Sequence, residues 1–145
     1  MTEKKTPVSD AALVEMAKEA MMRAYAPYSR HYVGAALLCD DGRVFCGCNI
    51  ENAAYSPSIC AERTALAKAV SEGARHFSAI AVVGGREGVI RGLFPPCGVC
   101  RQVLAEFCDP ASFRVILGTA DGYEVHTLGE VLPYGFFPSA LENDG

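Results

Sequence analysis

The most informative stretch of the sequence is Pro95-Pro96-Cys97-Gly98-Val99-Cys100. A Cys-x-x-Cys pair has several interpretations: a redox pair, half of a zinc site, or two buried thiols. A second stretch, Pro57-Ser58-Ile59-Cys60, has a similar setting, because each is a proline-containing turn at the start of a predicted helix. This third cysteine weakens the redox interpretation. Two helix N-termini directed at one point would bring three thiols together, and their positive ends would favour thiolates.

Three thiolates form a soft ligand set that suits zinc. Structural zinc usually has four protein ligands, whereas catalytic zinc usually has three and leaves one position for water. None of the three histidines in the chain stands at a metal-ligand spacing to these cysteines, so no fourth ligand is obvious. A three-ligand site therefore indicates hydrolytic chemistry.

Glu62 follows Cys60 by two residues and falls in the first turn of the predicted helix. One interpretation is a carboxylate favoured by the helix dipole. The other is a group that takes a proton from a zinc-activated water and returns it to a leaving group. The combined pattern Cys-Ala-Glu…Pro-Cys-x-x-Cys is more specific than its parts and matches the zinc-deaminase signature, in which the glutamate is an acid/base and not a ligand.

The chain resembles the small, nucleoside-type cytidine deaminases over most of its length. The segments that carry the resemblance are Tyr25-Ala26-Pro27-Tyr28-Ser29, Val33-Gly34-Ala35-Ala36-Leu37, Gly47-Cys48-Asn49-Ile50-Glu51-Asn52-Ala53, Cys60-Ala61-Glu62-Arg63-Thr64-Ala65, Pro96-Cys97-Gly98-Val99-Cys100-Arg101-Gln102-Val103 and Leu132-Pro133. The resemblance implies a three-layer α/β/α sandwich with a mixed five-stranded sheet, one zinc per subunit, and a homotetramer whose sites are completed across interfaces. It also implies hydrolysis of cytidine and deoxycytidine to uridine and deoxyuridine, with release of ammonia, in pyrimidine salvage.

The resemblance also assigns roles to residues of the metal site. It implies that Cys60, Cys97 and Cys100 are the zinc ligands and that Glu62 is the catalytic acid/base. Arg63 would hydrogen-bond the ligand sulfurs and withdraw their negative charge. The alternative for Arg63 is a solvated arginine on the helix surface.

The segment Asn49-Ile50-Glu51-Asn52 is a candidate sugar-binding site. An amide and a carboxylate two positions apart can face the same way on extended backbone, and together they can bind a pair of ribose hydroxyls. The matching positions of the family bind the sugar, which indicates nucleosides rather than free bases or nucleotides. An ordinary polar loop is the alternative. By resemblance, the backbone N–H of Ala61 would hold the carbonyl of the base.

Three aromatic or imidazole side chains are further candidates for substrate contact. His31 stands where the family commonly has a phenylalanine that stacks near the pyrimidine, so the strength of base stacking is in question. Phe136 matches a phenylalanine that the family lends to a neighbouring subunit, and Tyr55 belongs to the substrate-proximal segment. The alternatives are a tolerated histidine for His31 and a hydrophobic C-terminal anchor for Phe136.

Hydrophobic periodicity and turn signals predict α/β organisation with helices on both faces of a mixed sheet, in one domain spanning residues 1–145. Helices are predicted over residues 10–25, 60–73, 98–107 and 128–132, and strands over 32–39, 43–48, 79–83, 113–117 and 123–127. The turn Asp40-Asp41-Gly42 predicts a hairpin, and Gly84-Gly85 is interpreted as a turn.

Composition excludes several classes of protein. Lys and Arg total 13 against 17 Asp and Glu, a net charge of −4, which disfavours binding to nucleic acid or to anionic membranes. The longest strictly apolar run covers about five residues, 79–83, against roughly 20 for a membrane helix. The N-terminus lacks a signal-peptide pattern, so we expect a cytoplasmic, reducing location in which the seven cysteines are thiols or metal ligands.

Three rival functions remain at this point. Blasticidin S deaminases, which act on another aminated pyrimidine, share the Pro-Cys-Gly-x-Cys-Arg-Gln-Val motif, although the Asn49-Ile50-Glu51-Asn52 run favours cytidine. A polynucleotide editor is disfavoured by the acidic balance and the short chain. A non-catalytic zinc-binding module would not need Glu62 at its spacing.

Overall fold

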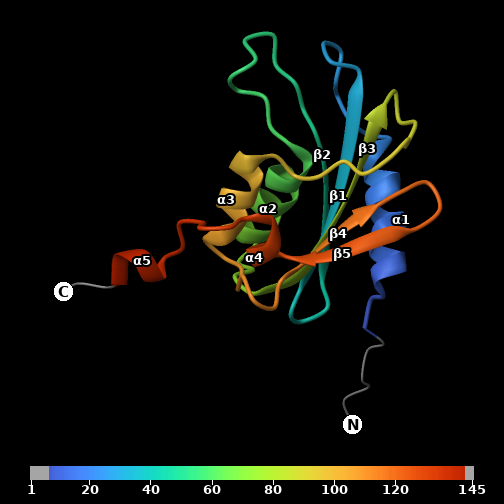
Figure 1. The fold of residues 1–145 in the computed structure, drawn as a ribbon. Helices are drawn as coiled ribbons and strands as arrows, with labels where there is room; N and C mark the ends of the chain where they lie inside the picture. Colours follow the sequence, from blue (N-terminus) through green and yellow to red (C-terminus); the bar gives the residue numbers. More distant parts are fainter. Residues whose placement is uncertain (1–6, 143–145) are drawn as a thin grey trace.

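The computed structural model describes residues 7–142 and consists of a mixed five-stranded sheet packed between helices (Figure 1). The strands are β1 (His31–Cys39), β2 (Val44–Cys48), β3 (Phe77–Arg86), β4 (Arg114–Gly118) and β5 (Tyr123–Thr127). The helices are α1 (Asp10–Met21), α2 (Ala61–Ser71), α3 (Gly98–Ala105), α4 (Leu128–Val131) and α5 (Ser139–Glu142). The strand order is β2-β1-β3-β4-β5, with β3 and β4 parallel and the other neighbouring pairs antiparallel. The predicted α/β class with a mixed sheet is confirmed.

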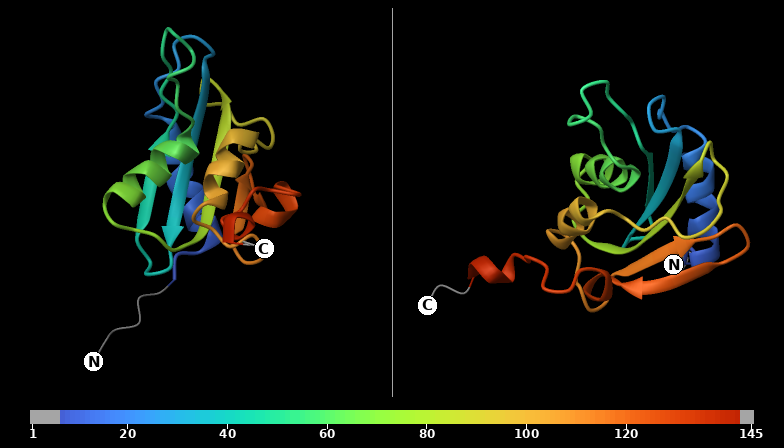
Figure 2. Two further views of the ribbon diagram at one scale, coloured as in Figure 1. Left: turned by 90° about the vertical axis from the view of Figure 1, so that its left-hand side faces the viewer. Right: turned by 45° about the horizontal axis from the view of Figure 1, so that its top comes forward.

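The helices form a layer on each face of the sheet (Figure 2). Helix α1 begins after the N-cap Ser9 and buries the apolar stripe that its periodicity predicts. It lies so close to β1 that a Cβ on Gly34 would overlap the backbone of Ala17. Helices α2 and α3 cover the opposite face, where Leu66 and Leu104 join a second hydrophobic core. The arrangement is the expected three-layer sandwich.

The prediction of a turn at Gly84-Gly85 is wrong, because both glycines lie inside β3. This strand is also longer at both ends than the predicted range 79–83. The two glycines are required for close packing: a Cβ on Gly84 would lie 2.7 Å from the ring of Phe94, and a Cβ on Gly85 would overlap the carbonyl of Val89. The loop after β3 therefore folds back over the end of the strand.

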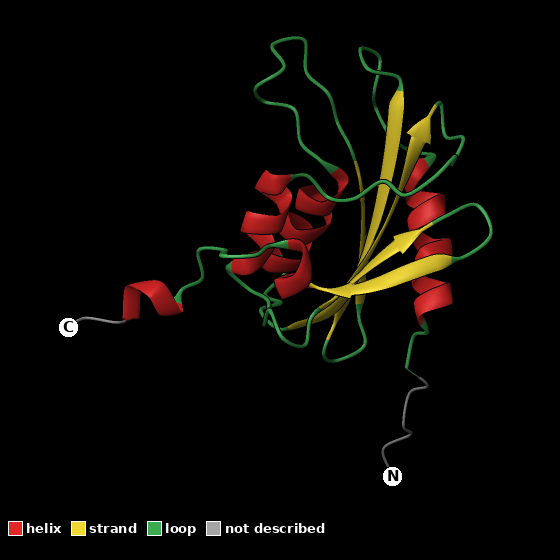
Figure 3. Ribbon diagram, in the orientation of Figure 1, coloured by secondary structure: helices red, strands yellow, loops and turns green. Residues whose placement is uncertain are grey.

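Three loops lie at one end of the sheet: residues 22–30, 49–60 and 87–97 (Figure 3). Backbone pairing of Tyr25 with Ile50 joins the first two. This pairing explains why α1 ends at Met21 although its apolar pattern predicts a helix to residue 25. The second and third loops lead directly into α2 and α3.

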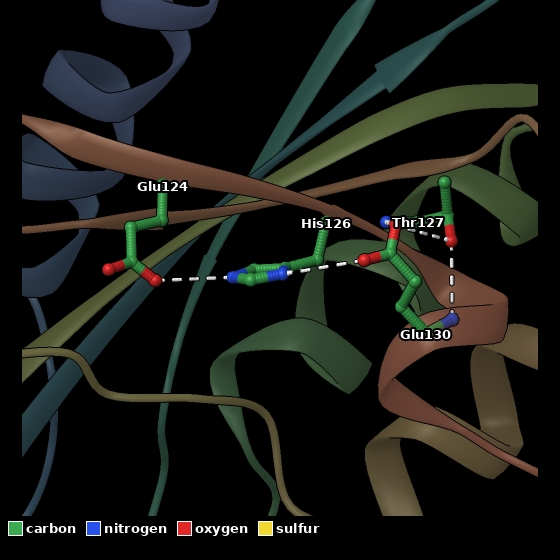
Figure 4. Close-up of polar contacts among 4 residues, drawn as sticks. All are labelled: Glu124, His126, Thr127 and Glu130. Atoms are coloured by element: carbon green, nitrogen blue, oxygen red, sulfur yellow. Dashed lines mark hydrogen bonds and ion pairs between the residues drawn. The ribbon is translucent and has the colours of Figure 1, made fainter.

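A capping box fixes the start of α4 (Figure 4). Thr127 Oγ1 accepts a hydrogen bond from the Glu130 N–H at 3.2 Å, and Glu130 Oε1 accepts one from the Thr127 N–H at 3.1 Å. His126 lies between two carboxylates, with Nε2 3.2 Å from Glu124 Oε2 and Nδ1 3.9 Å from Glu130 Oε2. These contacts hold α4 against the end of β5.

The C-terminal segment, residues 132–142, extends away from the sheet and ends in α5, a helix that the sequence pattern did not predict (Figures 1 and 2). The side chains of Tyr134, Phe136 and Leu141 are exposed along it. Apolar groups on an extended segment are typical of a surface that another chain covers.

None of the helices formed by residues 7–142 is long and apolar enough to cross a membrane.

Candidate metal centre and active site

Cys60 and Cys97 are the N-cap residues of α2 and α3. Both have extended backbone angles and neither side chain caps its own helix, so their sulfur atoms can face each other. Cys60 Sγ lies 3.9 Å from Cys97 Sγ, which in turn lies 3.5 Å from Cys100 Sγ. All three sulfur atoms lie within 4.8 Å of one another. Two helix N-termini thus bring three thiols together, as the sequence predicts.

This spacing fits one zinc ion. A Zn–S bond of about 2.3 Å with tetrahedral angles places sulfur atoms roughly 3.8 Å apart. The observed separations of 3.5 and 3.9 Å bracket that value. Cys100 is buried while Cys97 is exposed, so the cluster opens to solvent on one side. Three sulfur ligands leave one coordination position, which is the arrangement of catalytic zinc.

Hydrogen bonds stabilise the thiolate form of Cys60. Donors from Cys100 and from Arg63, whose Nη2 lies 3.5 Å from Cys60 Sγ, lower the pKa of Cys60 to about 5. The hydrogen bond to Cys60, together with burial, raises the pKa of Cys100. The cluster therefore carries thiolate character at neutral pH, and thiolate is the form that binds a metal.

Glu62 lies in the first turn of α2 and is 3% exposed. Its Oε1 atom is buried and has no hydrogen-bond partner. Burial raises the pKa of Glu62 above the usual value for a carboxyl group. An unpartnered buried oxygen costs stability, and a carboxyl group with a raised pKa is suited to proton transfer. The structure thus places a buried carboxyl group with a raised pKa two residues from a cysteine of the cluster.

Close packing on β2 sets the position of the α2 N-terminus. A Cβ on Gly47 would lie 2.5 Å from the Ala65 nitrogen and 2.6 Å from the Ala61 carbonyl oxygen. Ala61 itself is fully buried, with its backbone N–H at the start of the helix. The sheet therefore holds the segment that carries Cys60 and Glu62.

Asn49 and Glu51 both bind the backbone of the segment 28–33. Asn49 Oδ1 accepts a hydrogen bond from the Val33 N–H at 2.9 Å, and its Nδ2 donates to the His31 carbonyl at 2.8 Å. Glu51 Oε1 accepts from two successive N–H groups, those of residues 28 and 29, at 3.0 and 3.1 Å. Burial alone would raise the pKa of Glu51, but hydrogen bonding to the Ser29 side chain and to these two backbone N–H groups holds it below its usual value. Asn49 thus holds the start of β1, and Glu51 holds the loop that precedes it.

Two further predicted substrate contacts, His31 at the start of β1 and Tyr55 on the loop before α2, lie at the same end of the sheet. The His31 ring stacks on Phe94, with centroids 6.3 Å apart and planes at 29°, and its Nδ1 lies 2.9 Å from the Ser29 carbonyl oxygen. Tyr55 has a positive φ of 60° and packs edge-on against Tyr28, with its side chain exposed. The contact between His31 and Phe94 was not predicted from the sequence.

Phe136 is 58% exposed, and its backbone is held by Gln102. Gln102 Oε1 accepts a hydrogen bond from the Phe136 N–H at 3.1 Å, and Gln102 Nε2 donates to the Phe136 carbonyl at 2.6 Å. The residue before Gln102, Arg101, donates hydrogen bonds to the Pro96 carbonyl and to the Val131 carbonyl of α4. Sequence reasoning assigned no role to either residue, although two long polar side chains directly after Cys100 were a usable signal.

Comparison with known proteins decides the family. The family model for the cytidine and deoxycytidylate deaminase zinc-binding region matches residues 7–116. The chain belongs to the cytidine and deoxycytidylate deaminase family. The matched range contains the three clustered cysteines and Glu62.

Curated cytidine deaminases are similar to nearly the whole chain. The protein from Sporosarcina psychrophila is 51% identical over 125 residues, which is 86% of this chain and 88% of that protein. The protein from Halalkalibacterium halodurans is 52% identical over 133 residues, covering 91% of this chain and 96% of that protein. The resemblance to cytidine deaminases seen in the sequence motifs is confirmed.

Solved cytidine deaminase structures share the fold. The enzyme from Burkholderia pseudomallei has a TM-score of 0.81 at 47% identity, over 88% of this chain and 99% of that one. The enzyme from Mycobacterium tuberculosis has a TM-score of 0.73 at 39% identity, over 87% and 95% of the two chains. In this chain, as expected of a zinc-binding deaminase family, the three thiols converge where the loops meet the helices.

Proposed function

We propose that this protein is a zinc-dependent cytidine deaminase, which hydrolyses cytidine and deoxycytidine to uridine and deoxyuridine and releases ammonia. The observation that carries the proposal is the buried, unpartnered carboxyl oxygen of Glu62 beside a cluster of three sulfur ligands. A zinc-binding module without catalysis would not need this carboxyl group. Burying a carboxyl group without a partner costs stability, which favours a catalytic role for Glu62.

The chemistry divides between the metal and the chain. Zinc held by Cys60, Cys97 and Cys100 would lower the pKa of a water molecule towards about 7 and supply hydroxide for attack at C4. Glu62 accepts the proton that this water loses and donates it to N3 of the pyrimidine. Glu62 then transfers the remaining hydroxyl proton to the amino group, which leaves as ammonia. Atoms balance, since water and cytidine yield uridine and ammonia.

Arg63 adjusts the charge of the site. Three thiolates and one Zn²⁺ carry a net charge of −1, which would make the activated water less acidic. Arg63 Nη2 lies 3.5 Å from Cys60 Sγ and withdraws charge from that ligand. The guanidinium therefore supports ionisation of the water near neutral pH.

The loops at the same end of the sheet would hold the nucleoside. Asn49 and Glu51 are proposed to bind the ribose hydroxyls. The two backbone hydrogen bonds to Glu51 both go to its Oε1. The Asn49 amide donates one of its two N–H groups to the His31 carbonyl and keeps the other. The Ala61 N–H would hold the base carbonyl. A carboxylate beside the sugar repels a nearby phosphate, so nucleotides are expected to be poor substrates.

Aromatic contacts would complete the pocket. The His31 ring, already stacked on Phe94, lies at the start of β1 beside the loop that Glu51 holds, and it is proposed to stack near the pyrimidine. Tyr55 would lie close to the substrate from its loop. Phe136 is proposed to enter the site of a neighbouring subunit, because the segment that carries it extends away from its own sheet.

The proposed assembly is a homotetramer with sites completed across interfaces. Its support is the exposed apolar side chains of the C-terminal segment, together with family membership. We further propose a cytoplasmic role in pyrimidine salvage, since the zinc ligands need reduced thiols, and in the described chain all seven cysteines are free thiols. Neither nucleic acid nor a membrane is proposed as a partner.

A substrate panel tests the proposed specificity. Loss of ultraviolet absorbance and release of ammonia are measured with cytidine, deoxycytidine, cytosine, cytidine monophosphate and blasticidin S. The two nucleosides should turn over with the highest kcat/KM, and cytosine and the nucleotide should be poor. Preference for blasticidin S, the alternative that shares the cysteine motif, would contradict the proposal.

A further inference from the structure

The loop that leads into Cys97 has little backbone support of its own. Within residues 7–142, no backbone–backbone hydrogen bond reaches residues 90–96, and two of these are prolines without an N–H. The loop into Cys60 is different, because Ile59 and Ile50 exchange two backbone hydrogen bonds of 3.0 Å. The two cysteine loops are thus held in different ways. Backbone pairing holds the loop into Cys60, whereas the loop into Cys97 depends on side chains.

Arg101 supplies a side-chain hydrogen bond to the loop that leads into Cys97. Its Nε donates to the carbonyl of Pro96 at 2.8 Å, and no other side-chain hydrogen bond in the described chain reaches residues 90–96. The backbone N–H of Arg101 also donates to the Cys97 carbonyl at 3.0 Å. The peptide groups before and after Cys97 are therefore both fixed. Because a residue has only two soft backbone dihedrals, this fixes the direction in which the Cys97 side chain leaves the backbone.

The far side of the guanidinium is anchored as well. Arg101 Nη1 donates to the Val131 carbonyl at 2.9 Å. Val131 is the last residue of α4, whose start is held by the capping box of Thr127 and Glu130 (Figure 4). A guanidinium presents its donors in a rigid planar fork, so the bond to α4 also fixes the direction of the bond to Pro96. A lysine ammonium has no such fork.

We propose that Arg101 is a positioning residue for the zinc ligand Cys97: it clamps the Pro96 carbonyl against α4 and so holds the sulfur in place for the metal. The inference rests on the zinc site of the proposed deaminase. Arg101 touches neither the metal nor the substrate in this account, and its effect passes through the backbone of Cys97.

The test compares zinc affinity, measured by competition with a chromogenic chelator, in the full-length protein and three variants. Arg101→Lys keeps the charge and removes the fork, and Arg101→Met removes both. Gln102→Leu is the matched control, because Gln102 is the next residue of the same helix. Its side chain binds the backbone of Phe136 in the C-terminal segment and makes no hydrogen bond to Pro96. Circular dichroism shows whether each variant is folded.

We expect both Arg101 variants to bind zinc roughly 10- to 100-fold more weakly than the wild type, the usual effect of removing a group that orients a metal ligand. The absorption bands of the Co²⁺-substituted variants should shift, since these bands report the geometry of the ligand sulfurs. Gln102→Leu should keep the zinc affinity and the Co²⁺ spectrum of the wild type.

Wild-type zinc affinity in the two Arg101 variants would overturn the inference. Equal weakening in Gln102→Leu would also overturn it, because the effect would then come from the C-terminal segment. Loss of the fold in both Arg101 variants would contradict a role limited to positioning Cys97. A wild-type protein that binds no zinc would overturn the metal site and this inference together, and it differs from the other outcomes in affecting every variant.

Discussion

Cys60 Sγ and Cys97 Sγ lie 3.9 Å apart, although 37 positions separate the two residues in the chain. Each cysteine is the N-cap of a helix on the same face of the sheet. The distance between them is therefore set by how α2 and α3 pack on the strands, and the metal centre exists only in the folded protein. Zinc binding should accordingly contribute to folding stability.

Each of the variants Cys60→Ser, Cys97→Ser and Cys100→Ser should lose both zinc and activity, because a hydroxyl group is a poor replacement for a thiolate ligand. Metal content is measured by atomic absorption on the purified proteins. Cys48→Ser is the control, since Cys48 Sγ donates to the Arg23 carbonyl away from the cluster. A full zinc equivalent in all three ligand variants would show that the metal lies elsewhere.

Glu62→Gln should fold, retain zinc and lose turnover by about 10²- to 10⁴-fold, because the amide cannot carry a proton. The steady-state rate with cytidine and the zinc content are measured on the same preparation. Glu72→Gln, an exposed position just after the same helix, serves as control and should keep full activity. Turnover by Glu62→Gln close to the wild-type rate would exclude the role of proton carrier.

The protein should behave as a homotetramer in multi-angle light scattering. Phe136→Ser should raise KM for cytidine more than it lowers kcat, since the ring is proposed to contact substrate in a neighbouring subunit. A fully active monomer would be incompatible with sites completed across interfaces.

Gly47→Ala should destabilise the protein by about 1–3 kcal/mol, a typical cost of forcing an extra methyl into close packing. The added Cβ would lie 2.5 Å from the Ala65 nitrogen and push α2 away from β2. Thermal unfolding followed by circular dichroism measures the change. Gly92→Ala is the control, because a Cβ at Gly92 has no atom within 4 Å. Equal melting temperatures for the two variants would mean that α2 can shift freely.

Local signals in the sequence predicted the parts of the fold that depend on local physics. The apolar stripe of α1, the turn at Asp40-Asp41-Gly42 and the proline turns before Cys60 and Cys97 are each carried by neighbouring residues of one short segment. The meeting of the three sulfur atoms followed from the shared setting of those two turns. The clustering of Cys60, Cys97 and Cys100 was accordingly predictable.

Contacts made across the fold were not predictable in this way. Gly84-Gly85 has the composition of a turn, but pairing with Val33 and Tyr32 of β1 makes the two glycines part of a strand. The ring of Phe94 and the carbonyl of Val89 pack so closely over them that a Cβ would not fit. The contacts of Arg101 with Pro96 and Val131 likewise join the metal-ligand loop to α4, 30 residues further along the chain. Such long-range hydrogen bonds leave no periodic pattern in the sequence.

The most direct test of the account is to remove the metal from the purified protein, titrate zinc back, and follow cytidine deamination by ultraviolet absorbance during the titration. The account predicts no turnover without metal and a linear rise in rate that ends at one zinc per chain. Cytidine turnover that is unaffected by complete removal of zinc would contradict it, as would a fully zinc-loaded protein that releases no ammonia from cytidine.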